Sequence, residues 1–345
     1  MDTPAPHPDT TEPPRRRVTA YAPVDGAVVP LGLVPGAERP PGLIWIDMVA
    51  PSAADRQQVE AWTGLTLPSA AAMRDIAASQ RFRRRGQRLR LILPVIELDG
   101  MGQFSVQPAA FILTEDLLIT LREGEPNAFR QFADDLVERD PGELISGEDM
   151  LVGLLEAAID HMADLLEQTG RELAPLSRRV FTATGSLTGQ GRRLDRHLQV
   201  ILRQVGKLGD RVAVMLYAIG WLDPLPEFLA DLSHHAFSAE QLRRIDLMDR
   251  DLAGLERTAD HTLSRVQILL DATMGTISMR QTAINKVMSI AATIFLPPTL
   301  IGTIYGMNFQ AMPELGWPWG YPLALLAMVV SGVAPYLFIK WRGWL

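Results

Sequence analysis

The sequence predicts an α+β domain followed by a long helix and two C-terminal transmembrane helices. Residues 287–313 and 315–339 contain no charged side chain, and only Glu314 separates them. Each run can supply the roughly 20 mostly apolar residues that a membrane-spanning helix needs. Residues 238–296 contain no obvious helix-stop signal, which predicts one continuous helix leading into the first run. Short apolar runs within residues 18–140 have the length of strands, which predicts the α+β domain.

In residues 18–140 the pattern mixes strand and helix signals. Ser52 and Asp55 form a capping box that predicts the start of a helix. The expected elements are strands at 43–46, 89–98, 104–113 and 117–121, a helix at 52–63, and turns at 99–100 and 115–116. We therefore expect a mixed or antiparallel sheet, whose strand order the pattern does not define. Residues 1–17 are rich in proline, threonine and charge, which predicts a disordered tail.

Residues 141–286 are predicted to form a helical region that includes the start of the long helix. Ser146 and Asp149 can cap a helix that reaches about residue 181. A break at 185–191 precedes a second helix at 192–219, which the prolines at 223–226 end. Ser238 and Gln241 cap the long helix, which runs to about Tyr305, about 67 residues or about 100 Å. A helix of this length needs lateral support, so we interpret it as a stalk entering the membrane.

Composition and motifs argue against several other functions. The chain has no cysteine, which excludes thiolate metal sites, and its net charge of −7 argues against general nucleic-acid binding. No Walker phosphate-binding motif and no recognisable catalytic histidine spacing occur, so we expect neither ATP drive nor an enzyme. The pair His234–His235 is interpreted as a polar turn rather than a metal site. A basic cluster could form a phosphate patch but is interpreted as a solvated loop and strand edge: Arg81, Arg83, Arg84, Arg85, Arg88 and Arg90.

The two spans are predicted at 288–305 and 321–339, within a transmembrane domain of residues 287–345. Lys286 precedes the first span and Lys340 follows the second, whereas the loop at 306–320 has no Lys or Arg. The positive-inside rule therefore places both termini in the cytoplasm and the loop outside. A re-entrant hairpin is the alternative. The prolines at 297–298 free backbone carbonyls that need a neighbouring helix or water, which favours an oligomer or a wet pore.

One helical stripe continues from the expected stalk through the first span. At a spacing of 3.6 residues it comprises Thr303, Leu300, Leu296, Thr293, Ser289, Asn285, Thr282, Ser278, Gly275 and Asp271. Most of these residues are small or polar, and polar side chains in membrane helices face protein or water. The stripe suits either the wall of an ion path or tight packing between helices, because Ser and Thr also support membrane helix association.

Several motifs fall in the order found in one known family. They are Phe295-Leu-Pro-Pro-Thr-Leu300, Tyr305-Gly-Met-Asn-Phe309, Met312-Pro-Glu-Leu315 and Gly320-Tyr-Pro322, followed by a basic, Trp-containing C-terminus. This pattern resembles the CorA family of magnesium transporters. The resemblance is strong over about the last 75 residues and faint over the N-terminal third. It implies a homopentameric, funnel-shaped channel whose first span lines the pore, and it implies a selectivity filter at Gly306, Met307 and Asn308.

The resemblance also assigns expectations to residues along the stripe. Asp271 matches the aspartate at the cytoplasmic pore entrance, with a solvated stalk residue as the alternative. Met288 and Leu296 match apolar constrictions, with core packing as the alternative. Two positions depart from the family: Thr282 stands where asparagine is frequent, and Asn285 stands where an apolar gate residue is commoner. These departures predict a wetter inner constriction.

The function expected from these observations is passive, gated transport of Mg²⁺, and also of Co²⁺ or Ni²⁺, across the cytoplasmic (inner) membrane. Neutral Asn308 amides can hold a hydrated cation without binding it too firmly, and Glu314 can attract cations at the outer mouth. The family implies closure by cytoplasmic Mg²⁺. Five stalk acids could contribute, although a solvated face is the expected fate of each: Asp246, Asp249, Asp251, Glu256 and Asp260. The alternatives are a proton-coupled zinc transporter of the same superfamily and a non-conducting membrane sensor or scaffold.

Overall fold

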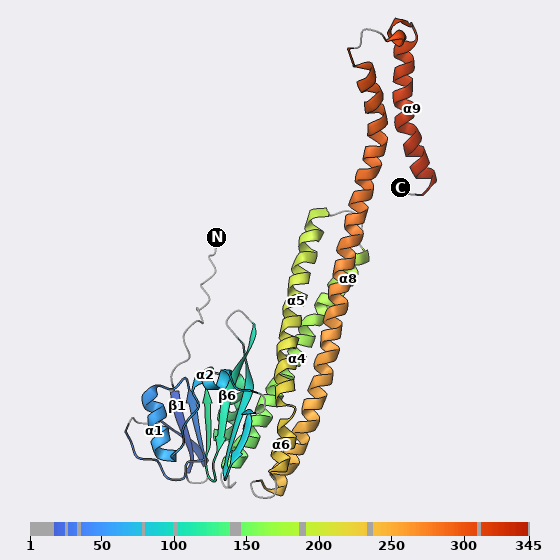
Figure 1. Cartoon of the computed structure of the whole chain (residues 1–345). Helices are drawn as coiled ribbons and strands as arrows, with labels where there is room; N and C mark the ends of the chain where they lie inside the picture. The colour runs from blue at the N-terminus through green and yellow to red at the C-terminus, as the bar shows by residue number, and fades with distance from the viewer. Residues whose placement is uncertain are drawn as a thin grey trace, which may run out of the picture. The chain divides into compact units, whose positions relative to one another are not determined.

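The computed structural model describes residues 17–24, 27–32, 36–77, 80–98, 103–138, 146–185, 191–232, 237–308 and 312–343 (Figure 1). Within these ranges the side chains of residues 183–185, 191–195, 314 and 315 are not described. The chain divides into two compact units, one formed by residues 1–179 and 200–270 and the other by residues 180–199 and 271–345. The predicted turn at 99–100 and the pair His234–His235 lie outside the described residues.

The first unit contains a seven-stranded mixed sheet with the strand order β2-β1-β3-β7-β6-β5-β4. The strands are β1 (Arg17–Val24), β2 (Ala27–Gly32), β3 (Trp45–Val49), β4 (Phe82–Arg85), β5 (Arg88–Leu98), β6 (Phe104–Leu113) and β7 (Leu118–Arg122). Only the pairing of β3 with β7 is parallel among the described strands. The expected mixed sheet is confirmed, with β3 two residues later than predicted and with β1, β2 and β4 missed.

Helices cover both faces of this sheet (Figure 1). On one face α1 (Ala53–Thr63) and α2 (Ala70–Arg74) close a small core around Ile46, Ile92 and Ile119. On the other face α3 (Asn127–Glu138) and the long helices close a larger core. The predicted capping box of α1 is confirmed, because Ser52 and Asp55 exchange side-chain-to-backbone hydrogen bonds.

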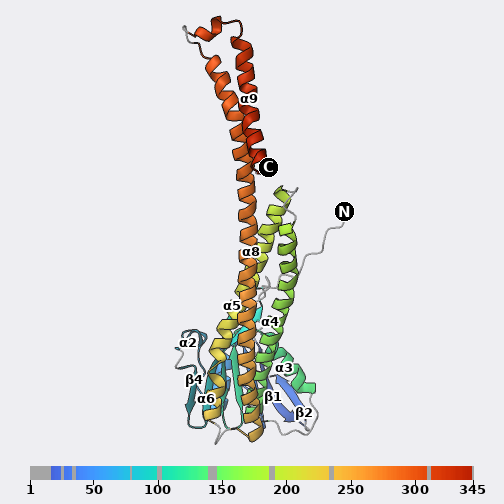
Figure 2. The same ribbon diagram turned by 90° about the vertical axis from the view of Figure 1, so that its right-hand side faces the viewer.

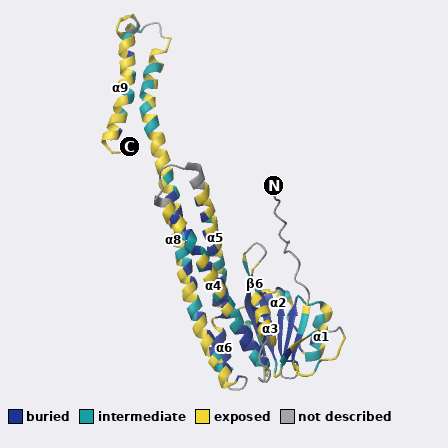
Figure 3. Ribbon diagram, turned by 180° about the vertical axis from the view of Figure 1, so that it is seen from behind, coloured by how far each residue is buried: buried dark blue, intermediate teal, exposed yellow. Residues whose placement is uncertain are grey.

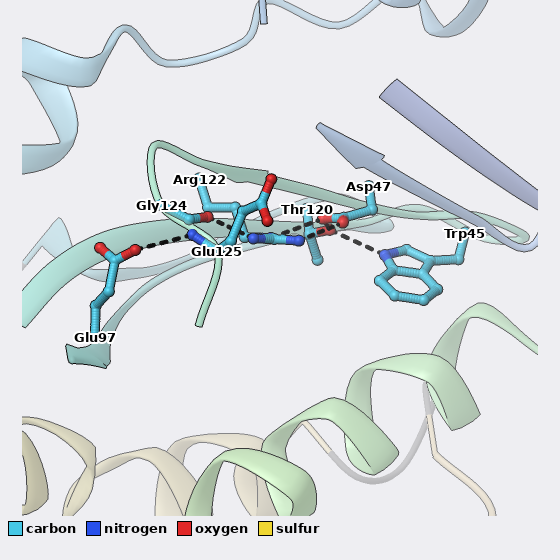
Figure 4. A network of polar contacts seen from close by, with 7 residues as sticks. All are labelled: Trp45, Asp47, Glu97, Thr120, Arg122, Gly124 and Glu125. Carbon is cyan, nitrogen blue, oxygen red and sulfur yellow. Dashed lines mark hydrogen bonds and ion pairs between the residues drawn. The ribbon is translucent and has the colours of Figure 1, made fainter. Parts of the chain in front are cut away.

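A buried polar network joins the two parallel strands at the centre of the sheet (Figure 4). Arg122 donates to Asp47 from Nε at 3.1 Å and from Nη2 at 2.7 Å. Thr120 donates its hydroxyl to Asp47 at 2.7 Å and accepts from the Trp45 indole at 2.9 Å. Both members of the ion pair are about 95% buried, with side-chain exposures of 5% and 4%. Burial, reinforced by the charge of Asp47, raises the pKa of the neighbouring Tyr21 to about 12.

Four helices complete the chain's helical region: α4 (Gly147–Gly185), α5 (Gly191–Leu222), α6 (Leu225–Asp231) and α8 (Ala239–Tyr305) (Figures 1 and 2). The predicted 67-residue helix is therefore confirmed as α8. Both predicted caps are present, since Asp149 and Gln241 each accept a hydrogen bond from the backbone N–H of the capping serine. Gln241 also donates to Asp149 at 2.6 Å, which fixes the starts of α4 and α8 to each other.

Charged groups between α4 and α8 are only partly balanced. Arg244 pairs with Glu156 through two hydrogen bonds. Burial, together with the carboxylates of Glu156 and Asp251 and of Asp164, raises the pKa of Asp160 above its ordinary value. Several carboxylates therefore lie near one another where α4 lies against α8.

The helix predicted at 192–219 is α5, which continues to Leu222 and ends at the proline-containing segment, as expected. A further helix, α6, begins at Leu225 after a two-residue turn. Proline is tolerated in the first turn of a helix, where its missing N–H has no intrahelical acceptor. Leu225 and Leu229 of α6 are buried in the larger core.

Candidate ion pathway

A helical hairpin in the second unit carries the residues expected to handle ions. The hairpin consists of the last part of α8, a short 3-10 helix η2 (Pro313–Gly316) and α9 (Gly320–Trp341). Helix α8 ends at Tyr305, immediately before the Gly-Met-Asn motif. The two helices lie side by side in both views of the chain (Figures 1 and 2). The hairpin thus places residues 306–308 at the tip of the helix that carries the stripe.

Three helices are long and apolar enough to cross a membrane in the described part of the chain, by length and composition alone. Two are α8 and α9, as predicted, and their most apolar windows are 0% and 6% buried within the chain. The third comprises residues 196–231, which the sequence analysis did not consider as a span, and its window is 50% buried. Its buried positions include Ile201, Val205 and Val212, which pack inside the protein. This burial accounts for its hydropathy without a bilayer.

Helix α8 contacts α9 through one defined face. The half-buried residues of this face are Ile290, Ala291, Ile294, Pro297, Pro298, Ile301 and Gly302. A Cβ added at Gly332 of α9 would lie 3.3 Å from Pro298 and 3.5 Å from the carbonyl oxygen of Ile294. A Cβ added at Gly302 would lie 3.4 Å from Met328. The helices therefore approach closely at Gly302 and Gly332, because a residue without a side chain leaves room for the opposite helix, as in other membrane helix pairs.

The stripe lies on a different face of α8, in the part of this helix where most residues are exposed (Figure 3). All ten of its residues, from Asp271 to Thr303, are exposed in the single chain. At 100° per residue the stripe points away from the face that contacts α9. The two apolar positions expected as constrictions are among the most exposed, with 68% for Met288 and 71% for Leu296, and Leu300 of the stripe is 61% exposed. Nothing in the described part of the chain covers this surface.

Each threonine of the stripe donates its hydroxyl hydrogen to the backbone carbonyl four residues earlier. Thr293 donates its hydroxyl to the carbonyl of Ser289 at 2.8 Å, and Thr303 donates to the carbonyl of Thr299 at 2.8 Å. Thr282 donates to the carbonyl of Ser278 at 3.0 Å. Each hydroxyl proton is therefore used inside the helix, and the remaining lone pairs point outward as acceptors. A row of acceptors suits the water shell of a cation, whose protons point away from the ion.

The two prolines of α8 add backbone acceptors. Proline has no N–H, so Pro297 and Pro298 leave the carbonyls of Thr293 and Ile294 without their usual donors four residues later. The Ile294 oxygen faces Gly332 of α9. The Thr293 carbonyl belongs to a stripe residue. The helix remains continuous through both prolines.

The Gly-Met-Asn motif forms an exposed turn at the end of α8. Gly306 donates its N–H to the carbonyls of Gly302 at 3.0 Å and Thr303 at 3.2 Å, and Met307 donates to Ile304 at 3.3 Å. The φ angle of Gly306 is outside the left-handed region, so the expected close turn exists without requiring glycine's special backbone freedom. The side chain of Asn308 is exposed. The side chain of Glu314, which belongs to η2, lies outside the described part.

A single chain arranges these residues in a line and not around a space. Asp271 and Thr303 are 32 positions apart on one helix, about 48 Å at 1.5 Å per residue. No group of three or more His, Asp or Glu side chains that could hold a metal ion occurs among the described residues. Within one chain these residues therefore follow a line along the helix.

Aromatic residues mark both ends of α9. Trp317, Trp319 and Tyr321 are exposed by 55%, 66% and 75% near its start. Trp341 is 81% exposed at its end, next to Lys340 and Arg342. This arrangement matches the aromatic belts that anchor spanning helices at the two membrane interfaces.

Comparison with known proteins gives the family. Residues 41–340 match the family described as "CorA-like Mg2+ transporter protein". The chain belongs to this family. The match covers β3 to β7, the long helices and the hairpin, so it includes much of the N-terminal third, where the motifs themselves gave little signal.

Curated relatives and solved structures agree with this assignment. The chain is 32% identical over 307 residues to the "Magnesium transport protein CorA" of Pasteurella multocida, covering 88% of this chain and 92% of that protein. It is 31% identical over 304 residues to the protein of the same name from Escherichia coli K12, with the same coverage. Its fold resembles the complete CorA structure from Methanocaldococcus jannaschii, with a TM-score of 0.74, 16% identity, and coverage of 95% of this chain and 99% of that chain. It also resembles full-length CmaX, with a TM-score of 0.63, 15% identity, and coverage of 96% and 98%.

Proposed function

We propose that this protein transports divalent cations, Mg²⁺ foremost and also Co²⁺ or Ni²⁺, passively through a gated pore in the cytoplasmic membrane. The observation that carries the proposal is the exposed stripe of α8, which ends at the Gly-Met-Asn turn in a chain of this family. The curated relatives are named magnesium transport proteins, which supports a transporter and not an enzyme.

The proposed assembly is a homopentamer in which α8 lines the pore and α9 lies outside it. A cyclic arrangement turns each stripe residue into a ring around the axis. It also removes the stripe from lipid, where Asn285 and Ser289 would be costly. The packing of α9 on a face of α8 away from the stripe supports this arrangement. Both termini are proposed to lie in the cytoplasm, because Lys and Arg flank the hairpin and are absent from its loop.

The proposed filter consists of Gly306, Met307 and Asn308 at the outer end of the pore. Mg²⁺ loses its waters reluctantly, so a filter that contacts the water shell avoids most of the dehydration cost. Asn308 amide oxygens supply neutral acceptors, and the partly negative C-terminus of α8 adds a favourable field. Glu314 is the loop's only charge and would concentrate cations at the mouth.

The inner pathway is proposed to use the rest of the stripe. Met288 and Leu296 are the candidate apolar constrictions, and Thr282 and Asn285 would make the path between Asp271 and these rings wetter. The hydroxyl lone pairs of Thr282, together with those further along the stripe, provide acceptors for ion-bound water. An inside-negative potential of 100 mV would favour entry of a divalent ion by about 4.6 kcal/mol, so no ATP is required.

Asp271→Ala is expected to lower Mg²⁺ conduction or shift its dependence on cytoplasmic Mg²⁺. Five carboxylates near the axis repel one another unless a cation lies among them, so the ring should concentrate divalent ions at the entrance. Flux through the purified variant, measured over a range of Mg²⁺ on the cytoplasmic side, tests this. Asp135→Ala on the exposed face of α3 is the matched control. An unchanged curve would return Asp271 to a solvated stalk position, and loss of the oligomer would show a structural role.

Closure is proposed to occur when cytoplasmic Mg²⁺ neutralises carboxylates between subunits. Acidic side chains gather around Asp160 of α4, where burial and the carboxylates of Glu156, Asp251 and Asp164 raise its pKa. Removal of Mg²⁺ should therefore loosen the first unit, and limited proteolysis should be faster in EDTA than in millimolar Mg²⁺. Equal digestion rates would argue against Mg²⁺-dependent closure, though not against conduction.

Two alternatives make different predictions in one experiment. Proteoliposomes are tested with Mg²⁺, Co²⁺, Ni²⁺ and Zn²⁺ separately, with and without a pH gradient. We expect Mg²⁺ entry that does not require the gradient. Zn²⁺ entry that depends on the gradient would favour a proton-coupled zinc transporter. Absence of flux for all four ions would favour a membrane sensor or scaffold.

A further inference from the structure

The β4–β5 hairpin carries four arginines on one face. Strand register places Arg83 opposite Arg90 and Arg85 opposite Arg88, so each pair lies on the same side of the sheet. Directly opposed like charges destabilise a strand pair. The neighbours Arg84 and Leu89 point to the other side, where Arg84 donates to the carbonyl of Gly86 at 2.9 Å. We call Arg83, Arg85, Arg88 and Arg90 the arginine face.

The arginine face forms no close ion pair within the described part of the chain, although Glu115 and Glu148 line a hollow together with Arg88. None of its four residues takes part in an ion pair there. Burial lowers the pKa of Arg90, and the charges of Arg83 and Arg85 add to this effect. The face lies on the edge strand β4 and on β5 beside it, and its residues Arg85 and Arg88 are exposed. Guanidinium groups that form no ion pair on these two strands are available to an acidic partner.

An acidic groove lies elsewhere on the first unit. It is a hollow of about 530 Å³ between α6 and the start of α8. Its lining is apolar at Pro226, Ala230, Leu242 and Ile245 and acidic at Glu227, Asp246 and Asp249. Asp246 is paired with Arg250 at 2.6 Å, which leaves Glu227 and Asp249 to give the groove its charge. All three carboxylates are on exposed residues.

The two surfaces cannot neutralise each other within one chain. Arg90 has the same strand parity as Ile92, which belongs to the core under α1 and α2. Leu91 and Leu93 belong to the opposite core, where Leu229 of α6 and Ile245 of α8 also pack. The sheet therefore lies between the side that carries Arg90 and the helices α6 and α8 that line the acidic groove. Two complementary surfaces on opposite sides of one subunit are what a head-to-tail ring requires.

We infer that the arginine face of one subunit binds the acidic groove of the next copy of this chain, so that arginines supply the positive charge at this contact. The inference rests on the proposed assembly into a ring of identical subunits. Charge complementarity and equal stoichiometry favour a second copy over an external polyanion, because every chain brings one groove for each arginine face. The contact would tie the sheet of each subunit to the stalk helix of its neighbour.

The chain's composition allows a direct test by zero-length coupling. It contains only three lysines, Lys207, Lys286 and Lys340, so few amines compete. The double variant Arg85→Lys with Arg88→Lys keeps the positive charge and adds two amines. A carbodiimide can join each amine to a carboxylate that contacts it by forming an amide bond. We expect covalent dimers and larger ladders of the full-length protein in detergent, with the new bonds mapped to Glu227 or Asp249. Arg130→Lys is the control, because Arg130 is exposed and contacts Asn127.

Mixing isotope-labelled and unlabelled chains assigns each bond to one chain or to two. Bonds between two chains at the groove support the inference. An assembled protein whose variant couples only within one chain, or to carboxylates outside the groove, overturns it. Adding vesicles of anionic lipid, or RNA, to the native protein gives a second readout. The double variant Arg85→Glu with Arg88→Glu is tested in the same way. If it loses binding to the polyanion but keeps the contact between subunits, the arginine face binds that polyanion and the inference is overturned.

Exchanging the charges of the two surfaces provides the strictest test of the contact between subunits. Arg85→Glu with Arg88→Glu, and separately Glu227→Arg with Asp249→Arg, should each reduce the oligomer fraction seen by native mass spectrometry. The four substitutions together should restore it, and a combination no better than either pair would contradict the contact. Mg²⁺ flux is measured in parallel on the unmodified protein. An assembled, conducting protein without the contact refutes only this inference, whereas a monomeric or non-conducting native protein refutes the proposed function.

Discussion

Asn308→Ala is expected to abolish Mg²⁺ uptake while the oligomer remains intact. The substitution removes the amide oxygens that would contact the ion's water shell at the end of α8, and it leaves the packing of α8 on α9 unchanged. The exposed position of Asn308 in the single chain supports the expectation that folding does not depend on this side chain. Uptake is measured in proteoliposomes with an Mg²⁺-sensitive dye, and assembly by native mass spectrometry.

A second substitution at the same position separates charge from shape. Asn308→Asp keeps the size of the side chain but places a ring of carboxylates at the filter, where a cation should bind too firmly to leave quickly. We expect Mg²⁺ to be retained and its flux to fall. Asn127→Ala at the start of α3 is the matched control. Normal Mg²⁺ uptake in a correctly assembled Asn308→Ala protein would refute the filter assignment.

Arg122→Met is expected to destabilise the first unit by about 3–5 kcal/mol. The substitution leaves Asp47 buried without its cation, at a position where its carboxylate side chain is only 4% exposed. The bond to the carbonyl of Gly124 is lost as well. Thermal unfolding of the full-length protein in detergent, monitored by the fluorescence of tryptophans that include buried Trp45, measures the change.

The double variant Asp47→Leu with Arg122→Met is the control for this effect. Removing both charges should recover much of the lost stability, because replacing a buried ion pair by apolar groups is often close to neutral. Arg171→Met, which breaks an exposed pair between residues four apart on α4, should cost less than about 1 kcal/mol. A loss of that small size for Arg122→Met would show that the network contributes little.

Local signals predicted the helices far better than the sheet. The serine caps at 52, 146 and 238 act through residues three positions away, so the sequence alone reveals them. Strand β4 was missed because Phe-Arg-Arg-Arg has no apolar alternation, and its place follows only from pairing with β5. The parallel pairing of β3 with β7 joins residues more than 70 positions apart, which no local pattern encodes.

The same division applies to the candidate pathway. The stripe could be predicted because helical periodicity fixes which residues share a face. The contact of Gly332 with the carbonyl of Ile294 could not, because it depends on how α9 packs against α8. The opposed arginine pairs were also hidden, since the sequence shows a basic run but not the register that aligns Arg83 with Arg90. Arg81 was expected in a solvated loop. Its guanidinium carbon Cζ instead lies 3.8 Å from the centroid of the Trp221 ring.

The most direct test of the central claim is Mg²⁺ entry into proteoliposomes that contain only this protein and carry a defined membrane potential. A potassium gradient with valinomycin sets the interior negative, and a second preparation has no potential. We expect Mg²⁺ to enter without ATP or a pH gradient, faster when the interior is negative, and at the background rate with Asn308→Ala. Entry no faster than in protein-free liposomes at either potential would contradict the proposed function.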